Sequence, residues 1–188
     1  MSDETNQTPA AEPEQPKVPG LEFYSTFQTL VVVLCALVLV FTFVGRLISV
    51  DGESMVPTLL DGELMAVQSI GYTPKQGDIV VLTQTSFREE AIVKRVIAKG
   101  GQTVEIDYEA GVVRVDGVAL DEPYINGTML PRGDVTSVTV PEGYLFVMGD
   151  NRNVSADSRY NDVGMIDERR VLGHALAVIL PFQKFTLL

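Results

Sequence analysis

The stretch Gly52-Glu53-Ser54-Met55-Val56-Pro57-Thr58-Leu59 follows shortly after a long apolar segment and separates two unlike parts of the chain. The chain cannot stay helical here, because Pro57 has no N–H and biases Val56 toward an extended conformation. A rigid turn of this kind can hold the Ser54 hydroxyl forward from a surface, as a nucleophile requires. A Ser-x-x-Pro sequence alone is more often an ordinary loop, so its meaning depends on the rest of the chain.

The apolar segment before this turn contains no charged residue between Phe23 and Val44. At a rise of about 1.5 Å per residue, such a helix extends roughly 33 Å, which is enough to cross a bilayer. A buried core helix would show a polar stripe, and a cleavable signal peptide would have a shorter apolar region and a small-x-small exit. We therefore expect an uncleaved membrane anchor over residues 21–46.

The segment before the anchor, residues 1–20, is polar and contains Pro9, Pro13, Pro16 and Pro19, which predicts a disordered tail. The flanking charges do not define its side of the membrane. The tail carries only Lys17 among several carboxylates, whereas Arg46 follows the apolar run. The positive-inside rule therefore gives no support for a cytoplasmic N-terminus.

Composition narrows the range of partners and cofactors. The chain has 188 residues and a net charge of −11, which argues against a nucleic-acid partner and allows one domain besides the anchor. The single cysteine, Cys35, lies within the apolar run, so neither a disulfide within the chain nor a cysteine-based metal site is possible.

From residue 47 onward, short apolar runs alternate with turn signals such as Asp61-Gly62 and Asp116-Gly117. No long helical period occurs in this region, so we expect a mainly β domain over residues 47–188, an antiparallel sandwich or barrel-like fold. The expected strands are Leu64–Ile70, Asp78–Gln84, Ala91–Ala98, Thr103–Asp107, Val112–Val115, Ser137–Val140, Tyr144–Met148 and Val171–Leu180.

A serine nucleophile needs a base, and two residues are candidates. The only histidine, His174, lies in the last apolar strand, where a structural or surface role is the more common one. Lys94 alternates with Ile92 and Val96 on one face of its strand, where desolvation would lower its pKa and allow it to act as a general base. An isolated lysine on a strand, however, more often reaches solvent from the strand edge.

A third stretch, Met148 to Arg159, begins directly after an apolar strand and is dense in hydrogen-bonding side chains. It could be a solvated loop with Asx turns and an Asp157–Arg159 pair. It could equally orient a buried amine.

Together these stretches resemble type I signal peptidase, also called leader peptidase, a membrane-bound serine protease with a Ser/Lys dyad. The similar segments, in the family's order, are Gly52-x-Ser54-Met55-x-Pro57-Thr58-Leu59, Gly77-Asp78-Ile79-Val80-Val81, Lys94-Arg95-Val96, and Gly149-Asp150-Asn151 with Ser155-x-Asp157-Ser158-Arg159. The short chain resembles the Gram-positive type, which has one N-terminal anchor.

The resemblance implies roles for individual residues. Ser54 would be the nucleophile and Lys94 its general base, neutral when active. Ser155 would hydrogen-bond the Lys94 amine. The remaining supporting residues would be Asp157 and Arg159 as an ion pair, with Ser158 packed nearby. The Ser54 N–H would be one donor of the oxyanion hole. In some family members a serine at the position of Gly52 adds a hydroxyl. With Gly52 here, its backbone or a water would have to take that place.

The resemblance also implies the substrate: exported preproteins, cleaved after small-x-small sequences such as Ala-x-Ala. The side-chain pockets would be lined by Val50, Met55, Leu59, Ile92 and Val93. The N-terminus would be cytoplasmic, the peptidase domain would lie outside the cell against the lipid bilayer, and no metal or nucleotide cofactor would be needed.

Three alternatives compete with this interpretation. One is a self-cleaving Ser/Lys protein of the repressor type, against which the anchor and the acidic charge argue. The others are a membrane-tethered β module that acts as a scaffold, and a catalytically inactive family member.

Overall fold

The computed structural model describes residues 21–43, 45–84 and 88–188, and the chain divides into two units, residues 1–39 and 40–188. The predicted tail, residues 1–20, lies outside the described residues. Helix α1 (Leu21–Phe43) coincides with the predicted anchor up to Phe43 and contains neither proline nor glycine. Judged on the residues that the structure describes, no helix combines the length and hydropathy needed to cross a membrane.

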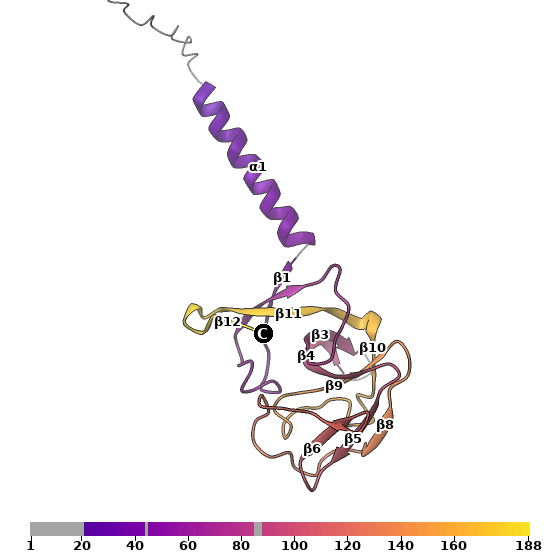
Figure 1. Ribbon diagram of the computed structural model, residues 1–188. Coiled ribbons are helices and arrows are strands. Elements are labelled where there is room, and N and C mark those ends of the chain that lie inside the picture. Colours follow the sequence, from indigo (N-terminus) through magenta and orange to yellow (C-terminus); the bar gives the residue numbers. More distant parts are fainter. Residues whose placement is uncertain (1–20, 44, 85–87) are drawn as a thin grey trace, which may run out of the picture. The chain divides into compact units, whose positions relative to one another are not determined.

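The second unit is built from two antiparallel sheets (Figure 1), which confirms the predicted mainly β class. The larger sheet has the order β1-β2-β11-β3-β4-β9-β10, with β12 paired to β11. Its strands are β1 (Gly45–Ser49), β2 (Leu64–Gln68), β3 (Ile79–Gln84), β4 (Arg88–Lys99), β9 (Tyr144–Met148), β10 (Ile166–Asp167), β11 (Val171–Leu180) and β12 (Thr186–Leu187).

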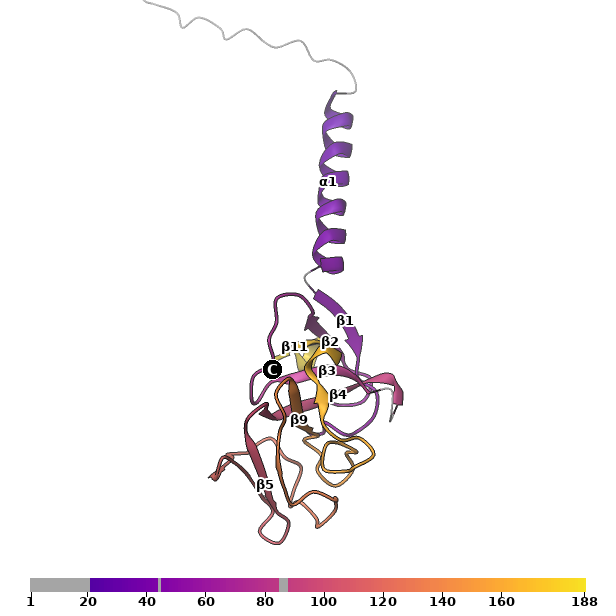
Figure 2. The same ribbon diagram turned by 90° about the vertical axis from the view of Figure 1, so that its right-hand side faces the viewer.

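The smaller sheet has the order β7-β6-β5-β8 and lies at the end of this unit away from β1 (Figures 1 and 2). Its strands are β5 (Thr103–Asp107), β6 (Val112–Val115), β7 (Val118–Ala119) and β8 (Ser137–Thr139). Two 3-10 turns, η1 (Glu168–Arg170) and η2 (Phe182–Lys184), flank β11.

All eight predicted strands are present, and β5, β6, β9 and β11 have the predicted bounds. Sequence reasoning missed β1, β7, β10 and β12. Three of these are two residues long, and β1 follows the apolar run after a single residue, with no turn signal to separate them. Because β1 begins at Gly45, the β structure starts before residue 47, inside the range predicted for the anchor.

The twelve-residue strand β4 is paired on both edges along only part of its length. Its first part pairs with β3, whereas β9 pairs with β4 only from Arg95 to Lys99. Within the described part of the chain, no strand pairs with the other edge of β4 along residues 90–94. Strand β1 is likewise the last strand of its sheet.

The loop between β1 and β2 is fastened by two fully buried side chains, Met55 and Leu59. They belong to a core cluster that includes Met65 of β2 and Val81 of β3. Burying a side chain of this size contributes about 1.5–3 kcal/mol. The loop is therefore held against the large sheet at two points on either side of Pro57.

Candidate active site

Ser54 lies directly before Met55, at the start of the turn that leads to Leu59. The turn is closed by hydrogen bonds from the Val56 N–H to the Glu53 carbonyl and from the Leu59 N–H to the Met55 carbonyl. The Val56–Pro57 peptide bond is cis. Met55 points into the core, while Ser54 stays partly exposed.

The Lys94 ammonium nitrogen lies 2.8 Å from the Ser54 hydroxyl oxygen and 3.0 Å from the Val93 carbonyl oxygen, and it donates to both. Lys94 is only 3% exposed. Its strand neighbours on the same face, Ile92 and Val96, lie in one core cluster, as the period-two alternation of a strand predicts. The structure thus brings together two residues that stand forty positions apart.

A groove of about 390 Å³ surrounds this pair. Its remaining lining residues come from the end of β1 and the following loop, from β3 and β4, and from the loop after β9: Ile48, Ser49, Val50, Asp51, Gly52, Glu53, Met55, Val81, Ala91, Ile92, Val93, Val154 and Ala156. Four of the five expected pocket residues line it. Leu59 does not, because it is wholly buried in the core beneath the loop.

Ser155 does not make the hydrogen bond to Lys94 that the resemblance implied. Its hydroxyl is buried and has no hydrogen-bond partner among the described residues. The Lys94 nitrogen is directed to Ser54 and Val93 instead. The Ser155 hydroxyl packs against Gly149, so closely that a Cβ on that glycine would overlap it.

Asp157 and Arg159 form a buried ion pair with two contacts, Nε to Oδ1 at 2.8 Å and Nη2 to Oδ2 at 2.9 Å. Burial lowers the pKa of Arg159, but the hydrogen bonds and charge of Asp157 outweigh burial and raise that pKa overall. Asp157 also accepts the Gly149 N–H at 3.0 Å. Ser158 packs beside this pair and binds the Val147 N–H of β9 through its hydroxyl.

The Gly52 N–H is hydrogen-bonded within the chain. It donates to the Asp61 carboxylate at 2.8 Å, so it is not a free oxyanion donor, contrary to one of the two options considered above. Asp61 reaches it because the chain folds back from Val50 to Gly62, whose N–H donates to the Val50 carbonyl. Gly52 itself has a φ of 87°, which glycine adopts readily.

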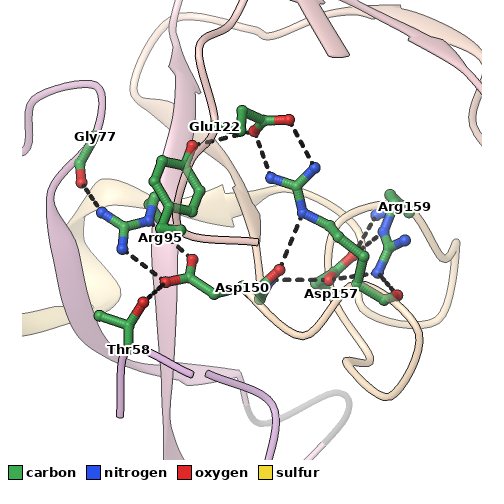
Figure 3. A network of polar contacts seen from close by, with 10 residues as sticks. Thr58, Gly77, Arg95, Glu122, Asp150, Asp157 and Arg159 are labelled. Carbon is green, nitrogen blue, oxygen red and sulfur yellow. Dashed lines mark hydrogen bonds and ion pairs between the residues drawn. The ribbon is translucent and has the colours of Figure 1, made fainter. Parts of the chain in front are cut away.

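Sequence reasoning assigned no role to a polar network behind the nucleophile loop (Figure 3). Arg95 donates twice to Asp150, at 2.8 and 2.7 Å, and once to the Gly77 carbonyl. Asp150 also accepts the Thr58 hydroxyl. The signal for this pair was present in the sequence, because Arg95 and Asp150 lie within the matching segments, but spacing does not show that they meet.

His174 lies outside the groove. Its ring stacks on Tyr72 with centroids 4.8 Å apart, and its Nε2 is 3.8 Å from an Asp78 oxygen. Burial, and then the hydrogen bond to Asp78, raise the pKa of Tyr72. The geometry agrees with the structural role expected for this histidine. Among the residues described, no three His, Cys, Asp or Glu side chains are grouped so that they could hold a metal ion.

A serine hydroxyl in contact with a desolvated lysine amine is an arrangement that supports nucleophilic chemistry, because an uncharged amine can take the hydroxyl proton. The apolar walls of the groove could receive small side chains of an extended chain. The open edges of β1 and β4 border the same groove, so a bound peptide could pair with either.

Comparison with known proteins identifies the family. The family model described as signal peptidase, peptidase S26, matches residues 23–180. The probable signal peptidase I-1 of Synechocystis sp. is 37% identical over 166 residues, covering 83% of this chain and 81% of that protein. Signal peptidase IB of Staphylococcus aureus is 36% identical over 176 residues, covering 84% and 89%.

Signal peptidase I of Bacillus licheniformis is 39% identical over 165 residues, covering 81% of this chain and 85% of that protein. A solved signal peptidase I from Enterococcus faecalis aligns with a TM-score of 0.46 and 29% identity, over 55% of this chain and 97% of the other. Residues 23–180 include both sheets except β12, together with every residue of the groove, and the chain belongs to the signal peptidase family, peptidase S26.

Proposed function

We propose that this chain is a signal peptidase I that removes N-terminal signal peptides from exported preproteins, with Ser54 as nucleophile and Lys94 as general base. The observation that carries the proposal is the 2.8 Å contact between the Ser54 hydroxyl and the Lys94 amine. Lys94 is buried among apolar side chains, and this surrounding favours its neutral form.

Acylation begins when the neutral Lys94 amine takes the proton of the Ser54 hydroxyl. The Ser54 oxygen then attacks the carbonyl carbon of the scissile peptide bond and forms a tetrahedral oxyanion. The Lys94 ammonium gives its proton to the departing amine as the C–N bond breaks. The mature protein leaves, and the signal peptide remains bound to Ser54 as an ester.

Deacylation uses the same lysine. Lys94 takes a proton from a water molecule, and the resulting hydroxide attacks the ester carbonyl. The Ser54–acyl bond breaks, and the Ser54 oxygen recovers a proton from Lys94. We propose the Ser54 N–H as one oxyanion donor and a water as the second, since the Gly52 N–H is bound to Asp61.

The proposed substrate class comes from the resemblance, and the lining of the groove supports it. Val50, Met55, Ile92 and Val93 give it apolar walls that suit small side chains, as in Ala-x-Ala-like sites. An extended preprotein segment would add as a strand to the unpaired edge of β4, whose residues 91–94 line the groove. Backbone pairing would hold the substrate and the pockets would select its side chains.

We also propose that the apolar run within the predicted anchor, which helix α1 covers up to Phe43, anchors the chain in a lipid bilayer. This part of the proposal rests on the sequence, in which residues 23–45 contain no charged side chain. Residues 1–20 would lie in the cytoplasm and the peptidase domain, residues 47–188, outside it. The orientation rests on the resemblance, and labelling of engineered cysteines on either side of the membrane would test it.

The decisive experiment compares full-length wild type in detergent with Ser54→Ala and Lys94→Ala on a preprotein that carries an Ala-x-Ala junction. The cut is mapped by mass spectrometry. Lys75→Ala is the matched control, because Lys75 is exposed and its described hydrogen bonds are all made by its backbone. We expect one cut after the second alanine, lost in both active-site variants and kept in the control.

Other outcomes would point elsewhere. Absence of cleavage by wild type would favour an inactive family member or a tethered scaffold. Cleavage of the enzyme's own chain instead of the preprotein would favour a self-cleaving Ser/Lys protein. Cleavage that survives Ser54→Ala would exclude Ser54 as the nucleophile.

A further inference from the structure

We propose that Glu122 and Tyr124, in the segment that follows β7, are positioning residues for the nucleophile. They hold two arginines that fix the loop after β9, and this loop in turn holds the turn that carries Ser54. The inference rests on the proposed function, because it assigns a further role in the same reaction. Neither residue touches the groove.

Glu122 holds Arg152. Both guanidinium Nη atoms donate to the two oxygens of the carboxylate, one of them at 2.9 Å, and the side chains are 6% and 0% exposed. The Arg152 Nε donates to the Gly149 carbonyl at 3.1 Å. A paired, planar guanidinium therefore fixes the backbone at the point where β9 ends and the loop begins.

Tyr124 holds Arg95. Its ring lies under the guanidinium, with 3.9 Å between the Arg95 carbon and the ring centre. This stacking holds the Arg95 guanidinium in the orientation in which it donates two hydrogen bonds to Asp150. The Tyr124 hydroxyl donates to Glu122 at 3.1 Å, which links the two arginines through one short segment. Pro123 between them restricts the backbone and favours an extended Glu122.

The same segment also contacts the loop through its backbone. The Asn126 N–H donates to the Asp150 carbonyl at 3.0 Å. Asp150 is thus fixed by its side chain through Arg95 and by its carbonyl through Asn126. Figure 3 shows the Asp150 carboxylate between Arg95 and Thr58.

The loop after β9 is hydrogen-bonded to the turn that carries Ser54. Asp150 accepts the Thr58 hydroxyl, four residues after Ser54. The Asn151 N–H donates to the Ser54 carbonyl at 3.0 Å, and its side-chain amide donates to the Glu53 carbonyl at 3.1 Å. A shift of the loop would therefore move the Ser54 backbone relative to Lys94, which is held separately in β4.

The charges explain why Glu122 is needed. Arg152 is a buried cation and Arg95 a partly buried one, and Glu122 and Asp150 are the anions that face them. Removing the charge of Glu122 leaves Arg152 as a buried cation without its partner, which forces it to move or to admit water. Neither ion pair includes a residue that lines the groove, so substrate binding should change less than the chemical step.

The test measures kcat and KM of the full-length enzyme for Glu122→Gln, Glu122→Asp, Tyr124→Phe and Tyr124→Leu, at a temperature where each variant is folded by circular dichroism. Glu105→Gln is the matched control, because Glu105 is an exposed carboxylate on β5 of the smaller sheet. For Glu122→Gln we expect kcat to fall about tenfold or more while KM stays within about threefold.

The conservative variants separate positioning from folding. Glu122→Asp should recover part of kcat because the charge returns, and Tyr124→Phe should keep kcat within about twofold of wild type because the ring stays over Arg95, whereas Tyr124→Leu should not. A folded Glu122→Gln enzyme with wild-type kcat would overturn the proposal. So would equal kcat for Tyr124→Phe and Tyr124→Leu, and this comparison decides if Glu122→Gln does not fold. An inactive wild type would instead count against the proposed function.

Discussion

The backbone N–H of Asn151 donates a 3.0 Å hydrogen bond to the carbonyl oxygen of Ser54, so the residue that carries the reactive hydroxyl is held from behind by the loop after β9. The Asn151 side chain adds a second hydrogen bond, to the Glu53 carbonyl. The orientation of Ser54 therefore depends on a loop almost a hundred residues away in the chain.

Replacing Asn151 with alanine should weaken this support without removing it, because the backbone hydrogen bond to Ser54 remains. The loss of one side-chain hydrogen bond corresponds to about 1 kcal/mol and to a fall in kcat/KM of about fivefold. Steady-state kinetics on an Ala-x-Ala peptide would measure this change. Asn161→Ala, at an exposed position, is the control and should behave as wild type.

Gly149→Ala should be far more damaging. A Cβ at this position would overlap both the Ser155 hydroxyl and the Ser54 carbonyl oxygen, and the backbone carbonyl cannot move away without taking Ser54 with it. A misplacement of about 1 Å can cost about 10²-fold in rate, and we expect a loss of that size in kcat. Gly45→Ala is the matched control, because a Cβ there meets only an ordinary contact at 3.7 Å. Wild-type kcat in Gly149→Ala would contradict the tight packing described above.

Asp157→Asn should reduce stability more than any surface charge change. It leaves the fully buried Arg159 without its ion-pair partner, a loss that costs about 3–5 kcal/mol. Urea unfolding would measure the change. Asp167→Asn breaks an exposed pair with Arg169 and should have a much smaller effect. Similar losses in the two variants would show that burial does not govern the Asp157–Arg159 pair.

The rate of cleavage should rise with pH as Lys94 loses its proton, because only the neutral amine can accept the Ser54 proton. A pH profile of kcat/KM from neutral to alkaline pH tests this. Lys94→Arg should be inactive at every pH, since a guanidinium stays protonated. A rate that is flat across the titration of Lys94 would argue against its role as base.

Stability should fall at alkaline pH for a separate reason. Burial first, then contacts with Asp78 and Glu122 respectively, raise the pKa of Tyr72 and Tyr124 above the ordinary value of 10.0. Below that pH both tyrosines are protonated in the folded and unfolded chains, so they add no pH dependence. Above it the unfolded chain ionises first, and the free energy of unfolding decreases.

Urea unfolding at a series of pH values from neutral to strongly alkaline would show the decrease. The double variant Tyr72→Phe/Tyr124→Phe should have a flatter profile than wild type, even if it is less stable throughout. An unchanged slope would mean that other groups cause the alkaline loss.

The sequence by itself determined the class of fold and named Ser54 and Lys94 as the candidate pair, whose side chains the structure brings into contact. Short runs such as Thr103–Asp107 and Tyr144–Met148, bounded by turn residues, define strands locally, so their bounds could be predicted. The segments around Ser54 and Lys94 are short and contiguous, and their order along the chain carries the resemblance. Strands of two residues, and β1 directly behind the apolar run, gave no comparable local signal.

The tertiary structure alone decided which groups meet. The resemblance implied that Ser155 would reach Lys94, that Leu59 would line the groove and that the Gly52 backbone or a water would complete the oxyanion hole. Packing placed Ser155 against Gly149, buried Leu59 in the core and bound Gly52 to Asp61. The connection from Glu122 and Tyr124 through two arginines to the nucleophile loop likewise joins segments distant in sequence. Such contacts depend on how the sheets and loops pack together. A local sequence pattern cannot predict them, because they join residues that come close only when the chain is folded.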